Sequence, residues 1–77
     1  MQLQDVRKAS GLSQSQLASA ADVKPRMLQN YEQGKQADIN NAKLSTILKL
    51  CLALDCRLSD ILDDPDTLDL LQKYEAR

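Results

Sequence analysis

The stretch "SQSQLASAADVKPRMLQNYEQG", residues 13–34, holds two short helical patterns separated by a tight turn. Ser13 and Gln16 have the spacing of a capping box, in which a hydroxyl and an amide cover backbone N–H groups at a helix start. Asp22 stands where the chain must turn, and Asp tolerates the left-handed conformation better than most residues. Pro25 suits the first position of a second helix, where its missing N–H costs nothing. The stretch therefore predicts a helix-turn-helix.

The second helix of this motif exposes many hydrogen-bonding side chains. Leu28 and Tyr31, three residues apart, place one side of it against a core. Three polar side chains on the opposite side follow the spacing i, i+4, i+7, namely Arg26, Asn30 and Gln33. In the DNA major groove, Arg pairs with guanine, while Asn and Gln pair with adenine. The pattern thus predicts a surface that reads base pairs, and a merely polar, solvated helix face is the alternative.

The rest of the chain also predicts helices, so we expect an all-α fold: a compact five-helix domain with, as an option, a short sixth helix at its C-terminal end. Residues 2–10 predict a short amphipathic helix that ends at Gly11. Residues 42–54 predict the central core helix, with Asn40 or Asn41 as its N-cap. The side chains expected on its core face are Leu44, Ile47, Leu48, Leu50, Cys51, Leu52 and Leu54.

Length and charge limit the classes of function that the chain can have. The 77 residues suffice for one domain with a single core, and Phe and Trp are absent. Residues 1–54 hold seven basic and four acidic side chains, a balance of +3, whereas residues 55–77 hold three basic and seven acidic ones, a balance of −4. A polyanion would therefore meet the first part and be repelled by the tail. Ordinary solvated surface is the alternative, because a balance of +3 is modest.

The chain offers little chemistry for catalysis or metal binding. Cys51 and Cys56 lie in an apolar stretch and there is no His, so we expect reduced core thiols, no metal and no cofactor. Asp63 and Asp64 precede Pro65 and predict the start of a last helix rather than a metal site. No nucleophile–base pair or phosphate-binding glycine loop is present, so an enzyme is not expected. Nothing indicates a signal peptide or a membrane span, and we expect a cytoplasmic protein.

Two segments carry a family resemblance. The segments "VRKASGLSQSQLASAADVKPRMLQNYEQGK", residues 6–35, and "LCLALDCRLSDIL", residues 50–62, resemble the phage-repressor and Cro helix-turn-helix family, also called the xenobiotic-response-element family. The similarity covers about residues 3–62. It implies a five-helix domain whose third helix enters the major groove of double-stranded DNA.

The resemblance also implies roles for individual residues. The base-reading positions, completed by Gln33 from the face described above, are Pro25, Arg26, Met27, Asn30 and Gln33. The positions expected to hold phosphates, with Lys24 and Gln29 added from their place beside that face, are Gln14, Lys24, Gln29, Lys35, Asn40, Asn41 and Lys43. Arg7 and Glu32 match a pair that ties the first helix to the recognition helix, and their opposite charges suit such a pair. The alternative for Arg7 is a free phosphate-binding cation.

The sequence departs from the family pattern around the recognition helix. Lys24 stands where the family often has Ser or Thr, so the recognition helix lacks a side-chain cap. Pro25 offsets part of this by fixing φ, but it cannot donate a hydrogen bond to a base. Asp22 replaces a common Gly, and the loop 34–41 is longer than in the phage prototypes.

Within this frame we expect a DNA-binding domain at residues 1–62, with its helix-turn-helix at 13–33, and an acidic extension at 63–77. The expected function is transcription regulation, as a repressor, by a homodimer on a palindromic operator. The available dimer surface is Leu58, Ile61, Leu62, Leu68, Leu71 and Tyr74. The last helix could instead pack back on its own core. The alternative function is an antitoxin or a bridging adaptor, in which the domain mainly binds a toxin or another regulatory protein.

Overall fold

The computed structural model describes residues 3–34 and 39–77, and every regular element in these ranges is helical. The all-α prediction is therefore confirmed. The elements are α1 (Leu3–Ala9), α2 (Gln14–Ala21), α3 (Pro25–Gln33), the 3₁₀ helix η1 (Ile39–Asn41), α4 (Leu44–Leu54), α5 (Leu58–Ile61) and α6 (Pro65–Glu75).

Helix ends follow the cap and turn residues of the sequence. Ser13 and Gln16 form the expected capping box: the Gln16 N–H donates to Ser13 Oγ at 3.1 Å, and the Ser13 N–H donates to Gln16 Oε1 at 2.8 Å. Asp22 ends α2 in the left-handed conformation at φ 55°, and Asp55 ends α4 in the same way at φ 52°. Gly34 ends α3 at φ 66°, where a residue without Cβ avoids steric strain. These three left-handed residues therefore fix where α2, α3 and α4 end.

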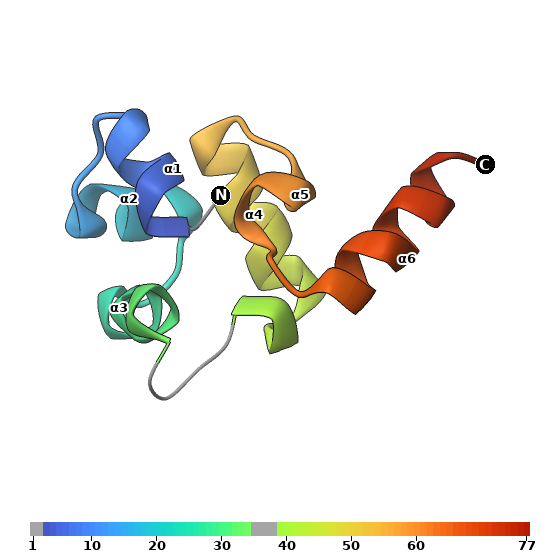
Figure 1. The fold of residues 1–77 in the computed structure, drawn as a ribbon. Coiled ribbons are helices and arrows are strands. Elements are labelled where there is room, and N and C mark those ends of the chain that lie inside the picture. The colour runs from blue at the N-terminus through green and yellow to red at the C-terminus, as the bar shows by residue number, and fades with distance from the viewer. Residues whose placement is uncertain (1–2, 35–38) are drawn as a thin grey trace.

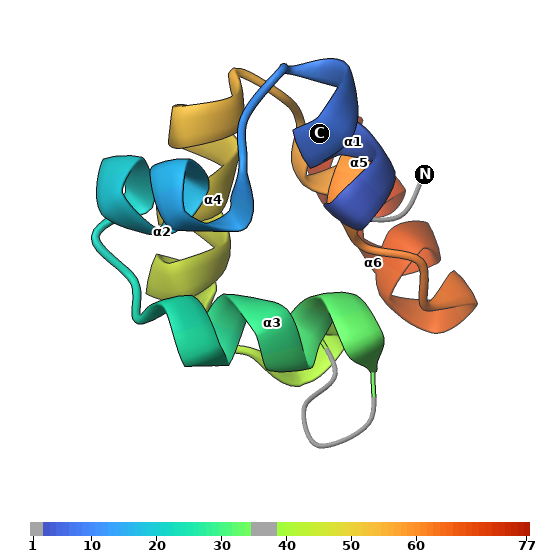
Figure 2. The ribbon, with the colours of Figure 1, turned by 90° about the vertical axis from the view of Figure 1, so that its left-hand side faces the viewer.

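The core lies between the first five α-helices. Helix α2 packs against both α3 and α4, while α1 packs against α3 and α5 (Figure 2). The largest side chains that are fully buried come from four different helices: Leu17, Leu28, Leu50 and Ile61. Truncation of such a leucine to alanine costs about 2–5 kcal/mol of the free energy of unfolding. One shared core thus fixes the helix-turn-helix on α4 and α5.

Helix α4 departs from the expected pattern in its start and in its faces. Asn40 and Asn41 lie in η1, and Lys43 occupies the N-cap position of α4 without a side-chain cap. Its buried residues are Ile47, Leu50, Cys51 and Leu54. The expectation that Leu44, Leu48 and Leu52 share this core face is wrong, because these residues are 63%, 44% and 83% exposed. The apolar surface of α4 is wider than the arc that α2 and α5 cover.

Helix α6 starts beside the core and extends away from the other helices (Figure 1). It has no fully buried residue, and it contacts the core cluster through Leu68. Leu68 and Leu71 are half-buried, whereas Leu70 and Tyr74 are each 66% exposed. The last helix thus packs back on its own core in part, through Leu68, while Leu70 and Tyr74 stay exposed. Its start is well formed, because the Asp64 carboxylate accepts hydrogen bonds from the Thr67 N–H at 3.0 Å and the Thr67 hydroxyl at 2.7 Å.

Candidate nucleic-acid interface

Helix α3 is held to the domain along one side only. Leu28 is fully buried in the core and Tyr31 packs against the same cluster, as their spacing predicted. Lys24 precedes the helix with extended backbone and no side-chain cap, and Pro25 takes the first helical position. Pro25 has no N–H, so the first turn of α3 has one unpaired donor fewer, although the donors that a side-chain cap would reach, at the second and third positions, gain no partner from Lys24. The helix lies along the lower edge of the domain in Figure 2.

The other side of α3 faces solvent. The exposed side chains on and beside it are Lys24, Pro25, Arg26, Met27, Gln29 and Gln33, and Asn30 is half-buried. Arg26, Asn30 and Gln33 therefore form one line of hydrogen-bonding groups along the helix, as the i, i+4, i+7 spacing requires. Several donors and acceptors at this spacing match what the base edges of a major groove present.

Arg7 and Glu32 join α1 to α3 across 25 positions of sequence. The Arg7 guanidinium donates from Nε to Glu32 Oε2 at 2.6 Å and from Nη2 to Oε1 at 3.0 Å. The two side chains are only 9% and 2% exposed. A third donor, Arg7 Nη1, reaches the Leu12 carbonyl oxygen at 2.9 Å. Arg7 is therefore a structural residue, and the alternative of a free phosphate-binding cation is wrong.

Gln14 completes this network from the start of α2. Its Nε2 donates to Glu32 Oε1 at 3.0 Å, so the Glu32 carboxylate receives three hydrogen bonds from two helices. The hydrogen bond to Glu32 raises the pKa of Arg7 against the opposing effect of burial, so the guanidinium stays charged. The side chain of Gln14 thus supports α3 from within the protein, while its backbone N–H at a helix N-terminus suits an anion.

The residues expected to hold the DNA backbone after α3 fall into three groups. Lys35 lies outside the described residues. Asn41 and Lys43 are exposed at the junction of η1 and α4. Asn40 instead binds the start of α6: its Nδ2 donates to Asp63 Oδ1 at 2.6 Å, and its Oδ1 accepts from the N–H groups of Asp63 and Asp64, each at 3.0 Å. A role for the Asn40 side chain on phosphate therefore competes with an internal one.

Two of the residues offered as a dimer surface are not accessible. Ile61 is fully buried and Leu62 is 5% exposed, because both complete the core beneath α1 and α4. Leu58, Leu68 and Leu71 are half-buried and Tyr74 is exposed. The sequence did not predict that Leu44, Leu48 and Leu52 are exposed. Leucines at helical spacing predict a buried side of the helix, whether or not another element covers that side.

The described thiols and carboxylates do not gather into a metal site. Within residues 3–34 and 39–77, no three His, Cys, Asp or Glu side chains gather closely enough to hold a metal ion. Cys51 is buried and Cys56 is half-buried, and both are free thiols. Burial, with a smaller contribution from Cys56, raises the pKa of Cys51 to about 12. Over the same ranges, no helix is long and apolar enough to cross a membrane.

Comparison with known proteins identifies the family to which this arrangement of helices belongs. A family model described as "Helix-turn-helix" matches residues 3–61. No curated protein and no solved structure matches the chain. The matched residues include α1 to α5 and therefore both the buried Arg7–Glu32 pair and the exposed side of α3. The chain belongs to the phage-repressor and Cro type of helix-turn-helix proteins, the xenobiotic-response-element family of DNA-binding transcription regulators.

Proposed function

We propose that the protein represses transcription by binding, as a homodimer, to a palindromic operator in double-stranded DNA, with α3 in the major groove. The observation that carries this proposal is the division of α3 into two sides. One side is fixed by Leu28 and by the Arg7–Glu32 pair, and the other carries exposed Arg26 and Gln33 with half-buried Asn30 between them. A reading helix needs both properties, because base contacts discriminate only when the helix cannot shift.

The bases would be read by a few side chains of different chemistry. Arg26 suits a guanine, and Asn30 and Gln33 suit adenines. Pro25 and Met27 have no hydrogen-bonding hydrogen to offer a base, so their contribution would be apolar, for example against a thymine methyl group. Arg26 and Asn30 would thus carry most of the direct reading.

Contacts with phosphates would fix the helix in the groove. The exposed candidates beside α3 are Lys24 and Gln29, and those beyond it are Asn41 and Lys43, with Lys35 in the intervening segment. The Gln14 backbone N–H adds a helix N-terminus on the other flank. Such contacts supply affinity that depends on salt and not on sequence.

Dimerisation follows from the small number of base contacts. A single α3 offers five base-reading positions, of which only Arg26, Asn30 and Gln33 can form hydrogen bonds with bases, and this is too few for a specific site. Two copies related by a two-fold axis would double the contacts and place two copies of α3 in successive major grooves about 34–36 Å apart. Repression would follow from occupancy of a promoter.

Selection of bound sequences from a random duplex library tests the proposal. We expect a palindromic motif with half-sites about one helical turn apart. On that motif, Arg26→Ala should weaken binding by about 1–3 kcal/mol and relax one base preference, whereas Lys43→Ala should weaken all sequences alike. Lys73→Ala is the matched control, because Lys73 lies on α6 and pairs with Asp69, and both side chains are exposed. Binding that none of these substitutions changes would overturn the assignment of α3 as the reading helix.

The antitoxin or adaptor function is the second candidate, favoured by the uncovered apolar side of α6. Salt dependence separates the two functions. A DNA-binding regulator loses affinity steeply as salt rises, because bound phosphates release counterions. A chain that binds no duplex at low salt, and is recovered bound to a protein encoded beside it, would be an adaptor.

A further inference from the structure

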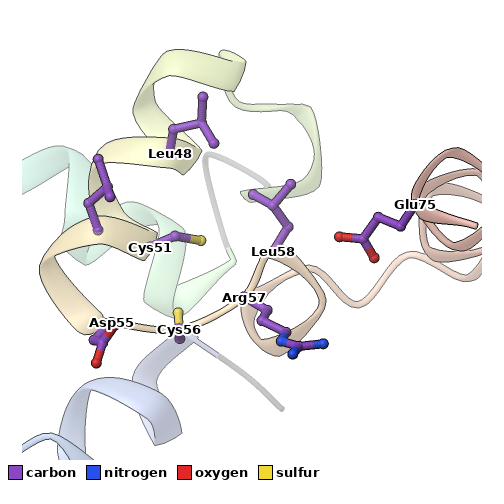
Figure 3. A pocket seen from close by; sticks show the side chains of 8 residues that line it. Leu48, Cys51, Asp55, Cys56, Arg57, Leu58 and Glu75 are labelled. Atoms are coloured by element: carbon purple, nitrogen blue, oxygen red, sulfur yellow. The ribbon is translucent and has the colours of Figure 1, made fainter.

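The two cysteines of the chain lie together at the C-terminal end of α4. Cys51 belongs to the last turn of this helix, and the Cys56 N–H donates to the Cys51 carbonyl oxygen at 3.0 Å, across the turn at Asp55. Such a backbone hydrogen bond keeps the two Cα atoms within about 7 Å of each other. Both side chains line one hollow of about 360 Å³, and Figure 3 shows the Cys56 sulfur directed toward Cys51. The fold therefore holds the two thiols side by side.

The hollow is open to solvent and has an apolar lining. Cys56 is half-buried, whereas Cys51 is only 7% exposed. Leu48, Leu52 and Leu58 line the same hollow. The first two of these leucines are exposed, so an apolar group can reach the lining from solvent. A ligand therefore meets Cys56 first and Cys51 afterwards. No lining residue belongs to α3, so the hollow is separate from the surface proposed to read DNA.

Burial keeps both thiols protonated at neutral pH. It raises the pKa of Cys51 to about 12 and also raises the pKa of Cys56. A hydrogen bond between the two thiols adds to the rise at Cys51 and opposes it at Cys56, as expected when the Cys51 S–H is the donor. Zn²⁺ and similar ions bind thiolates and would have to displace both protons. Among the described residues, no third His, Cys, Asp or Glu joins the pair to complete a metal site.

We propose that Cys51 and Cys56 form a chelating site for a trivalent arsenical that carries one apolar substituent. Arsenic in this state is a soft centre that suits sulfur ligands. Each thiol replaces one hydroxyl group on arsenic: an S–H and an As–O bond break, an S–As and an O–H bond form, and water leaves. Arsenic stays trivalent, so the reaction needs no oxidant. It consumes protonated thiols and releases no net proton, so it fits the protonation state that burial imposes.

The geometry favours a bridging atom over a direct disulfide. A disulfide requires sulfur atoms about 2 Å apart with a dihedral angle near 90°, whereas an arsenic atom between them accepts a wider spacing. A disulfide also needs an oxidant and forms through a thiolate, which burial disfavours at both positions. Cys56 forms the first bond to arsenic because it is the more exposed thiol. Cys51 then closes the ring within the same complex, where its effective concentration is high.

Intact-mass spectrometry of the full chain with phenylarsine oxide, which is a dihydroxyarsine in water, tests the site. We expect one phenylarsenic group per chain with neither hydroxyl left, whereas attachment through one thiol leaves one hydroxyl. The product should persist in excess glutathione, a monothiol, and be removed by dithiothreitol. In that excess, Cys56→Ser and Cys51→Ala should each raise the dissociation constant at least about a hundredfold. Cys56 is half-buried, so Cys56→Ser should fold even where Cys51→Ala is destabilised. A one-thiol product, or retention by Cys56→Ser, overturns the proposal.

A second comparison tests the place of the substituent. Leu48→Ala removes part of the apolar lining and should raise the dissociation constant for phenylarsine oxide about threefold or more. It should leave the constant for arsenous acid, which lacks the phenyl group, within about twofold. Leu44→Ala is the matched control, because Leu44 is an exposed leucine of the same helix that does not line this hollow. Equal effects of Leu48→Ala on both arsenicals, or no effect on either, overturn the placement of the substituent.

Discussion

Arg7 Nε and Glu32 Oε2 lie 2.6 Å apart, and this contact connects the first helix of the chain to the last turn of the exposed α3 helix. Both side chains are almost fully removed from water. The pair therefore fixes α3 from the inside while leaving its outer side chains for a ligand.

Removal of one partner of this pair should be strongly destabilising. Arg7→Met leaves the Glu32 carboxylate buried without its main donor, and Glu32→Leu leaves the guanidinium without its acceptor. Each should cost about 3–5 kcal/mol of the free energy of unfolding, a large share of what a domain of this size has. The measurement is urea denaturation monitored by circular dichroism.

The double variant is the control for that prediction. Arg7→Met with Glu32→Leu removes both charges together, so its cost should be well below the sum of the two single costs. Additive costs would show that the two residues do not act as a pair.

Lys24→Ser should raise the stability of the fold and lower its affinity for DNA. Lys24 is an N-cap with extended backbone and no side-chain hydrogen bond. A serine there can accept from a backbone N–H of the first turn and should raise the free energy of unfolding by about 0.5–2 kcal/mol. Loss of the cation should at the same time lower affinity for every DNA sequence and reduce the salt slope by about one. Thermal melts and fluorescence anisotropy titrations at several salt concentrations measure the two effects, and a change of the same sign in both would contradict this.

Asn40→Ala should loosen the start of α6. The substitution removes the acceptor of the Asp63 and Asp64 N–H groups and the donor to the Asp63 carboxylate. We expect amide hydrogen exchange to speed up at these two residues and along α6, with a loss of global stability of about 1 kcal/mol. Asn41→Ala, at the exposed neighbour, is the control and should leave exchange in α6 unchanged.

Cys51 should make stability fall at alkaline pH. Burial raises the pKa of its thiol to about 12, above the value of about 8.5 expected in the unfolded chain. The folded state then holds the proton more strongly, so this contribution is complete below about pH 8.5 and is lost as the pH rises through the folded pKa. Melting temperatures from pH 7 to 10 of the natural chain and of Cys51→Ala measure it, and the natural chain should lose more. Parallel curves for the two proteins would rule out the effect.

The sequence predicts the helix-turn-helix well because local chemistry determines its ends. The Ser13 box, the left-handed Asp22 and Pro25 at the first position of α3 depend on neighbouring residues only, and each is present as expected. Arg7 and Glu32 were identified by family resemblance, since no local rule joins residues 25 positions apart.

Which side of a helix is buried is harder to predict from the sequence than where the helix ends. Periodicity shows that Leu44, Leu48 and Leu52 share a side of α4, but not whether another helix covers that side. The same limit applies to Ile61 and Leu62, which look like free apolar residues of a short helix and are core. The family resemblance predicts a phosphate contact for Asn40, whereas its side chain binds residues 63 and 64, which come after α4 and α5 in the chain.

The bond between Asn40 and the start of α6 has a geometric consequence. Besides the contact of Leu68 with the core, the start of α6 is held by the side chain of Asn40, which also lies shortly after α3 in the chain. In a dimer joined through α6, a small rotation at that amide would swing the two α3 helices apart or together. Asn40 would then determine the distance between the half-sites that the dimer accepts. Its substitution would change the preferred half-site spacing more than the affinity for each half-site.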